Sequence, residues 1–138
     1  MPRPVTPALA VDVIIELADR PGRPIVLIER RYPPPGHAIP GGFVNVGETV
    51  EDAARREARE ETGLEVTLGE LLGVYSDPRR DSRGHTVSLV YIASATGEPA
   101  AGDDAAAVLV VQPRAAPELA FDHRLILDDY LRRIEFRP

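Results

Sequence analysis

The chain places its apolar residues in short runs, and the spacing within each run predicts a mixture of strands and helices. Val, Ile and Leu dominate residues 8–17 and 24–29, which are separated by a turn-forming cluster at 19–22. Two runs of this kind around such a cluster are typical of a hairpin. Residues 64–76 and 85–95 alternate well enough to be strands, and a polar loop joins them. The pattern therefore predicts strands in both halves of the chain.

Two further segments have helical spacing. Apolar residues recur at intervals of about one helical turn through 121–134. Thr49 precedes two acids in an arrangement that resembles a capping box, and Gly63 is placed to end the helix that begins there. A short strand at 106–111 completes the order of strands, helix, strands, helix. This order predicts one α+β domain over residues 1–138, built in three layers around a mixed sheet.

Composition changes this picture mainly by exclusion. The chain has 22 acidic and 16 basic side chains, a net charge of -6, so we expect no nucleic-acid partner and no anionic membrane surface. The absence of cysteine excludes thiolate chemistry and zinc fingers, and Mg²⁺ becomes the natural candidate for any metal. No run is long enough to span a bilayer, and residues 5–17 carry two acids where a signal peptide is apolar. We therefore expect a cytoplasmic protein.

The helix predicted after Thr49 carries charge on both of its faces. At 100° per residue, Glu57 and Glu61 lie near the middle of the apolar stripe. The opposite face carries four polar residues, Glu51, Arg55, Arg59 and Thr62. Glu51 and Arg55 are spaced to form an ion pair. Two carboxylates on a core-facing side repel each other and resist desolvation, so that face meets a wet cleft or a positive group. With Glu60 at its margin, we predict a site for one or more Mg²⁺ ions ahead of a structural acidic cluster.

The segment from Gly42 to Leu64 resembles the Nudix box, the signature G-x5-E-x7-R-E-U-x-E-E-x-G-U of the Nudix hydrolases, in which U is aliphatic. Seven fixed residues agree, and at a frequency of about one in fifteen each this occurs by chance about once in 10⁸ starts. The resemblance implies a Nudix-type α/β/α sandwich with a mixed sheet. It also implies an enzyme in which water attacks a phosphorus of a nucleoside diphosphate linked to another moiety.

The resemblance assigns roles to individual positions of the box. In Nudix hydrolases the glutamates of the R-E-U-x-E-E segment bind Mg²⁺ or Mn²⁺, and here these are Glu57, Glu60 and Glu61. A backbone carbonyl at the position of Gly41 assists them. The residues implied in catalysis are Glu57, Glu60, Arg56 and Glu48, of which Arg56 orients the glutamates by ion pairing and Glu48 is the first glutamate of the box.

The general base is left open by the resemblance, because in this family it is either a box glutamate or an acid from a loop. Candidates outside the box are Glu98, Asp103 and Asp104, and a solvated loop acid is the simpler interpretation of each one. Two positions depart from the usual pattern. Asn45 replaces a frequent acid, and His37 replaces a frequent tryptophan.

Segments outside the box resemble the small ADP-ribose pyrophosphatase-like branch of the family. Guanidinium groups suit phosphate oxygens, so five arginines are candidate substrate contacts: Arg30, Arg31, Arg79, Arg80 and Arg83. Tyr32 and Phe43 could stack on adenine, although a core or hinge role is the default for both. His123, at the start of the last predicted helix, is interpreted as a capping or packing residue.

The leading hypothesis is hydrolysis of ADP-ribose, a small-molecule nucleotide, to AMP and ribose 5-phosphate. One alternative is a MutT-like enzyme that cleaves a nucleoside triphosphate to its monophosphate and pyrophosphate. A second is a non-catalytic Nudix domain that senses a nucleotide, which the intact acidic box disfavours. Members of the ADP-ribose branch are often homodimers, so the resemblance also implies a homodimer.

Overall fold

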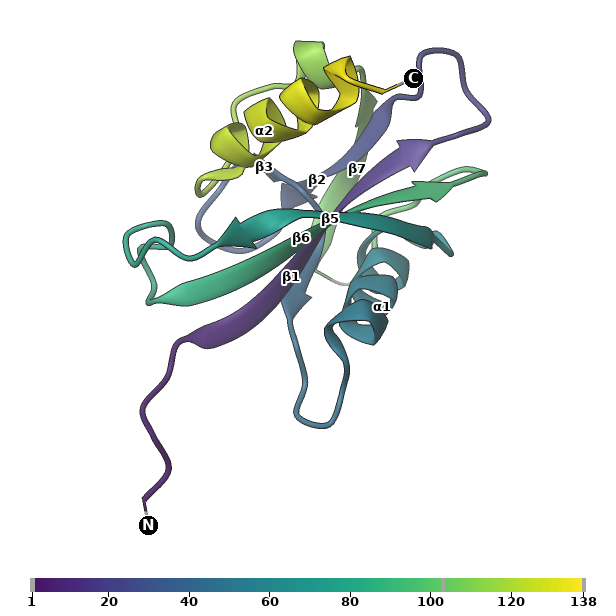
Figure 1. The fold of residues 1–138 in the computed structure, drawn as a ribbon. Coiled ribbons are helices and arrows are strands. Elements are labelled where there is room, and N and C mark those ends of the chain that lie inside the picture. Colours follow the sequence, from purple (N-terminus) through teal and green to yellow (C-terminus); the bar gives the residue numbers. More distant parts are fainter. Residues whose placement is uncertain (1, 103, 138) are drawn as a thin grey trace.

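The computed structural model describes residues 2–102 and 104–137, and it shows a β-sheet between the helices α1 (Val50–Thr62) and α2 (His123–Glu135) (Figure 1). The strands are β1 (Ala8–Leu17), β2 (Ile25–Arg30), β3 (His37–Ala38), β4 (Gly41–Phe43), β5 (Thr67–Tyr75), β6 (Thr86–Ala95) and β7 (Ala105–Val111), with a 3-10 turn at Pro113–Ala115. The main path of the sheet is β3-β2-β1-β6-β5, and β4 and β7 pair with β1 and β2. Because β1 and β6 are parallel and the other pairs antiparallel, the predicted mixed-sheet sandwich is confirmed.

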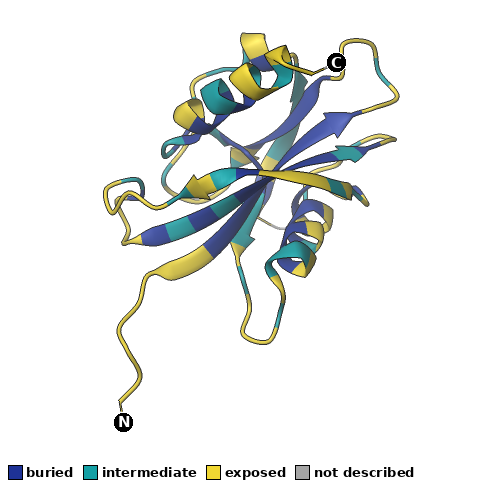
Figure 2. Cartoon of the chain, viewed as in Figure 1, coloured by how far each residue is buried: buried dark blue, intermediate teal, exposed yellow. Residues whose placement is uncertain are grey.

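β1 lies at the centre of the sheet and supplies side chains to both layers. Its odd-numbered residues from Val11 to Leu17 belong to a core cluster with the alanines of α1. Ile14 belongs to a second cluster with Leu127 and Tyr130 of α2. Asp12 and Glu16 point to the same side as Ile14 and are also buried. The centre of the sheet is therefore covered on both faces, as the burial colours show (Figure 2).

The ends of α1 confirm the predicted caps. The Thr49 hydroxyl accepts a hydrogen bond from the Asp52 backbone N–H at 3.1 Å. At the other end Gly63 has φ 72° and donates its N–H to the Arg59 carbonyl, which is the left-handed cap that glycine favours. These local signals fix the length of the helix that carries the box glutamates.

Two predictions about the outer face of α1 were wrong. Thr62 is fully buried, because the loop after β6 covers the last turn, and its hydroxyl donates to the Ala58 carbonyl at 2.6 Å. Arg55 pairs with Asp52 at 3.1 Å and not with Glu51. Both i, i+3 and i, i+4 neighbours lie within reach on a helix, so spacing alone did not select the partner.

The sequence pattern located the long strands and missed the short ones. The first two strands form the predicted antiparallel hairpin, with Glu16 opposite Ile25. β3 and β4 are too short to show a period, yet β4 supplies the two glycines next to the box helix. Among the described residues, no helix is long and apolar enough to cross a membrane.

Candidate active site

α1 places Glu57 and Glu61 one turn apart on the side that faces the sheet, as the helical wheel predicted. Both are buried, with 8% and 7% of their surface exposed. β4 runs directly alongside the first of them, because a Cβ added to Gly42 would lie 2.5 Å from the Glu57 carboxylate. A side chain at position 42 would therefore displace Glu57, which explains the glycine in physical terms.

The charge of this carboxylate pair is poorly compensated. Burial, followed by the charge of Glu57, raises the pKa of Glu61 to about 8. Burial also raises the pKa of Glu57, although the Arg56 guanidinium opposes that shift. One carboxylate oxygen of Glu61, Oε2, is buried without a hydrogen-bond partner among the described residues. An oxygen donor of this kind suits a hard divalent cation.

Arg56 connects the glutamates of the box. Its guanidinium donates two hydrogen bonds to the Glu48 carboxylate, at 2.7 and 2.9 Å, and one to Glu57 at 2.7 Å. It also contacts Glu60 at 3.1 Å and the Phe43 carbonyl at 2.9 Å. Hydrogen bonds from Arg56 lower the pKa of Glu48 to about 2. Arg56 thus makes the ion pairs that the resemblance implied.

The fit of a divalent cation rests on the donor chemistry. Within the described residues, no three acidic or histidine side chains converge as a complete metal-binding group. Glu57 and Glu60 direct their carboxylates to Arg56, and the Glu60 side chain is 51% exposed. The unpartnered oxygen of Glu61 and the repulsion between buried carboxylates nevertheless fit a bound cation, since an ion of opposite charge would relieve both.

The loop between β6 and β7 brings one further acid to the glutamates. Its backbone is bound to the end of α1, because Gly102 donates its N–H to the Glu61 carbonyl at 3.1 Å. Asp104 consequently lines the same cavity as Glu57 and Glu61, and its charge raises the pKa of both. Glu98 lies elsewhere, paired with Arg20 and largely exposed. Asp103 lies outside the described residues.

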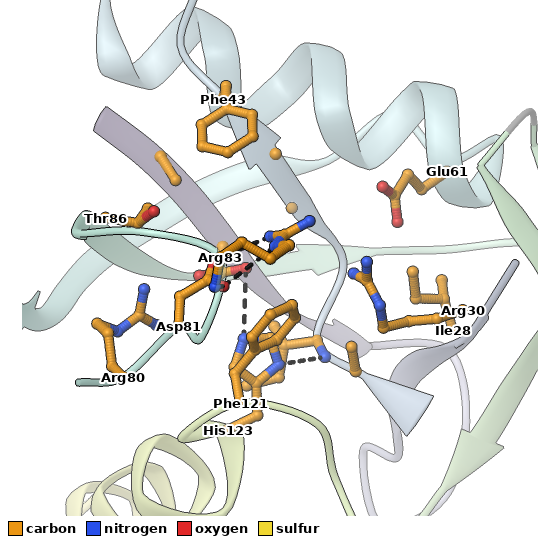
Figure 3. A pocket seen from close by; sticks show the side chains of 16 residues that line it. Ile28, Arg30, Phe43, Glu61, Arg80, Asp81, Arg83, Thr86, Phe121 and His123 are labelled. Carbon is orange, nitrogen blue, oxygen red and sulfur yellow. Dashed lines mark hydrogen bonds and ion pairs between the residues drawn. The ribbon is translucent and has the colours of Figure 1, made fainter. Parts of the chain in front are cut away.

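Two adjoining cavities open beside α1. We call the first the glutamate cleft, and its lining includes Tyr32, Arg56, Glu57, Glu61 and Asp104. We call the second the Phe121 recess, and its lining includes Asp12, Arg80, Thr86, Phe121 and His123 (Figure 3). Several residues line both cavities: Ile28, Arg30, Gly41, Gly42, Phe43, Glu61 and Arg83. The cavities therefore form one continuous site.

Two of the predicted arginines meet in this continuous site. The guanidinium groups of Arg30 and Arg83 lie 4.9 and 5.1 Å from the centre of the Phe121 ring. The Arg30 guanidinium donates hydrogen bonds to the carbonyls of Pro33 and Pro34. Burial, followed by the charge of Arg83, lowers the pKa of Arg30. Arg83 already donates two hydrogen bonds to the Asp81 carboxylate, at 3.0 and 2.9 Å, whereas Arg30 has no acidic partner within 4 Å among the described residues. Arg30 is therefore the guanidinium that most favours an added anion in this site.

The other three arginines lie differently from the expectation. Arg80 lines the recess, but its guanidinium is buried and binds both oxygens of Asp122, at 2.8 and 2.9 Å. Arg79 is 90% exposed and pairs with Asp77, outside the lining of both cavities. Arg31 bonds to the Ala105 carbonyl at 3.5 Å and also lies outside that lining.

Aromatic residues and two buried polar groups complete the site. Tyr32 and Phe43 are 56% and 50% exposed, so of the core or hinge role expected for them the core half was wrong. His123 is buried as predicted, but it also lines the recess beside Asp12. The sequence reasoning missed Asp12, although an acid on the buried face of an apolar strand is itself a signal.

The chain belongs to the Nudix family, whose family model, described as NUDIX domain, matches residues 6–131. This match confirms the family that the box predicted.

Two relatives and one solved structure illustrate the similarity. The chain is 50% identical over 129 residues to an ADP-ribose pyrophosphatase of Methanocaldococcus jannaschii, covering 91% of this chain and 74% of that protein. It is 28% identical over 137 residues to the ADPR responsive transcriptional repressor NtrR of Acinetobacter baylyi, covering 94% of this chain and 55% of the repressor. A bifunctional NMN adenylyltransferase/ADP ribose pyrophosphatase from Francisella tularensis, complexed with AMP and a manganese ion, superposes with a TM-score of 0.79. That structure is 26% identical, and the match covers 93% of this chain and 42% of the other.

Proposed function

We propose that the chain is a Nudix pyrophosphohydrolase that cleaves ADP-ribose to AMP and ribose 5-phosphate with the help of Mg²⁺ or Mn²⁺. The observation that carries the proposal is the buried pair Glu57 and Glu61, which opens into the same cleft as Arg30. The 50% identity to an ADP-ribose pyrophosphatase supports the choice of substrate. Acidic and basic groups in one cleft suit a cation together with a diphosphate.

Four groups would hold the metal: the side chains of Glu57, Glu60 and Glu61 and the carbonyl of Gly41. When bound, Mg²⁺ or Mn²⁺ supplies neutralisation of the diphosphate charge and a lower pKa for the attacking water. Arg56 keeps the glutamates in position through its ion pairs with them and with Glu48.

The remaining steps fall to side chains that line the two cavities. Arg30 and Arg83 line the continuous site and bind phosphate oxygens, Arg83 through the Nη1 group that its pair with Asp81 leaves free. Asp104 accepts the proton of the water, since of the outside acids that the structure describes it is the one in the glutamate cleft. The water oxygen bonds to phosphorus as the anhydride P–O bond breaks, and the departing phosphate oxygen takes the electron pair.

Other expectations stay predictions beside this proposal. They are a single functional domain, a cytoplasmic location, a homodimer and the absence of a nucleic-acid partner. Size-exclusion chromatography with light scattering tests the homodimer directly. A protein that is monomeric at micromolar concentration would refute the predicted homodimer.

A substrate panel tests the function. The purified protein is incubated with Mg²⁺ or Mn²⁺ and ADP-ribose, NADH, dinucleoside polyphosphates or each nucleoside triphosphate, and the products are quantified. We expect equal amounts of AMP and ribose 5-phosphate from ADP-ribose. Turnover of triphosphates alone would replace the assignment by the MutT-like alternative. Tight ADP-ribose binding without turnover would favour a sensor, which the similarity to an ADPR responsive repressor makes worth testing.

A further inference from the structure

The Phe121 recess contains two buried polar side chains that no step of the proposed reaction uses. Asp12 comes from the centre of β1 and His123 from the first residue of α2. They are 8% and 3% exposed, and both line the recess. Buried polar groups normally have hydrogen-bond partners. The donor and acceptor atoms that this pair leaves unused therefore indicate which ligand groups the recess can bind.

Asp12 has one acceptor oxygen already occupied. The Ser88 hydroxyl of the neighbouring strand β6 donates to its Oδ2. This bond fixes the carboxylate and leaves Oδ1 on the side of His123. A carboxylate oxygen held in this way accepts hydrogen bonds and donates none.

His123 presents a donor beside that acceptor. Its Nδ1 accepts the backbone N–H of Ile39 at 3.0 Å, so the ring proton lies on Nε2. Burial lowers the pKa of His123, which keeps the ring neutral. The Nε2 atom lies 3.8 Å from Oδ1 of Asp12, too far for a hydrogen bond between them. The two groups therefore remain available to a third partner.

The position of the recess narrows the chemistry of that partner. The recess is continuous with the glutamate cleft through Arg30, Glu61 and Arg83. In ADP-ribose, the ring at each end of the diphosphate is a ribose, and the adenine base is one ring further away. Ribose hydroxyls donate and accept together, so they match an acceptor and a donor placed side by side.

We propose that Asp12 and His123 form a ribose subsite, in which the hydroxyls of a ribose joined to the diphosphate donate to Asp12 and accept from His123. The proposal rests on the proposed function for the identity of the diphosphate. ADP-ribose contains two riboses, in the nucleoside and at the other end, and both offer the same chemistry. Thr86 and Arg83 are further polar residues in the lining of the recess.

Binding of the two reaction products tests the subsite without any turnover. Calorimetry with Mg²⁺ present gives the Kd of AMP and of ribose 5-phosphate for the wild type and for Asp12→Asn, in which an amide can still accept from Ser88. We expect one product to bind about 10- to 100-fold more weakly to the variant, the usual effect of losing a hydrogen bond to a charged group. The product that loses affinity identifies which ribose occupies the recess.

Deoxy analogues show whether the loss belongs to a hydroxyl. The probes are 2′,3′-dideoxy-AMP for the nucleoside ribose and 2-deoxyribose 5-phosphate for the other. We expect the deoxy analogue of the affected product to bind the wild type more weakly than the product itself does. The same analogue should bind Asp12→Asn as well as it binds the wild type, because the hydroxyl that contacts Asp12 is already missing. The subsite would be overturned if Asp12→Asn weakened the binding of the parent compound and of its deoxy analogue by the same factor. It would also be overturned if the loss of affinity in Asp12→Asn disappeared when AMP is replaced by IMP, which differs from AMP only in the base.

Two further variants separate the contact from damage to the fold. His123→Asn keeps an acceptor for Ile39 and removes the ring donor, so we expect a loss of about 3- to 10-fold for the same product. Glu16→Gln neutralises a second buried acid of β1, which Tyr130 and Arg137 hold outside the recess, and it should bind both products as the wild type does. Unchanged product affinity in both recess variants would refute the subsite even if ADP-ribose is hydrolysed. Loss of product affinity in a protein that hydrolyses no ADP-ribose would support the subsite and refute the proposed function.

Discussion

At the scale of single residues, the chemistry of this protein depends on charges that have been removed from water. Among the described residues, one buried oxygen of Glu61 has no hydrogen-bond partner, and the charges of Glu57, Asp104 and Asp12 repel its carboxylate. Arg30 offsets this repulsion only in part. An arrangement of this kind lowers the stability of the protein unless a cation binds, so metal binding and folding stability should be linked.

We expect Glu61→Gln to slow ADP-ribose hydrolysis by about 100-fold or more, because an amide replaces a carboxylate that would hold the metal. The same variant should unfold at a higher temperature than the wild type in chelator at pH 8.5, since a buried charge is removed. Calorimetry and steady-state kinetics measure both effects. Glu65→Gln, at a side chain that is 76% exposed, is the matched control. Wild-type turnover in Glu61→Gln would refute the metal role.

At the scale of elements, two loops carry side chains to the glutamates. The segment between β5 and β6 is fixed to the start of α2 by the buried Arg80–Asp122 pair. This places Arg83 over Phe121. The segment between β6 and β7 is fixed to the end of α1 through Gly102, where a Cβ would overlap the Glu60 carbonyl oxygen. Each loop is therefore held through a residue of its own, Arg80 or Gly102, that does not line the glutamate cleft.

We expect Arg80→Ala to lower the free energy of unfolding by about 2–3 kcal/mol, because the part-buried Asp122 loses both of its hydrogen bonds from a charged partner. The KM for ADP-ribose should rise as well, since the loop also carries Arg83. Denaturant unfolding and initial rates measure these changes. Arg79→Ala, one residue earlier and exposed, should change stability by less than about 0.5 kcal/mol. Equal effects of the two variants would contradict the positioning role of Arg80.

Gly102→Ala tests the second loop. The added methyl group must push the loop away from α1, and Asp104 moves with it. We expect kcat to fall by about 10- to 100-fold with a KM close to the wild-type value, as displacement of a catalytic group by about 1 Å can have such an effect. Ala101→Ser, at the exposed neighbouring position, is the control. A changed KM with an unchanged kcat would place the effect in substrate binding instead.

At the scale of the whole molecule, the net charge of -6 is unevenly distributed. Residues 42–64 contain six acids and three arginines, so their net charge is -3, half of the total. A bound divalent cation would offset most of this local excess. The negative charge of the protein is thus compatible with an anionic substrate, because a cation can lie between them.

Stability should depend on pH in a direction set by Glu61. Its pKa is raised to about 8 in the folded protein from an ordinary value of 4.5, so the folded state binds more protons than the unfolded state between these values. The free energy of unfolding in chelator should therefore fall as pH rises from 6.5 to 9. Mg²⁺ should stabilise the protein more at pH 8.5 than at pH 6.5, because protons compete with the metal. Thermal unfolding at both pH values checks this, and Glu61→Gln should flatten the dependence. A wild-type dependence as flat as that of the variant would exclude Glu61 as its source.

The sequence by itself determined the parts of this protein that depend on near neighbours. A threonine and a glycine fixed the ends of α1, and helical periodicity placed Glu57 and Glu61 on its inner face. Apolar alternation located the long strands. These features are predictable because hydrogen bonds and side-chain periods act over a few residues.

Only the tertiary structure decided which distant residues join the glutamates. Asp12 meets Ser88 across 76 positions of the chain, and Ile39 meets His123 across 84. Arg80 pairs with the distant Asp122, whereas Arg83 from the same loop pairs with the nearby Asp81 and also lines the glutamate cleft. No local pattern distinguishes such neighbours, because the parallel pairing of β1 with β6 and the packing of α2 on the sheet set their distances.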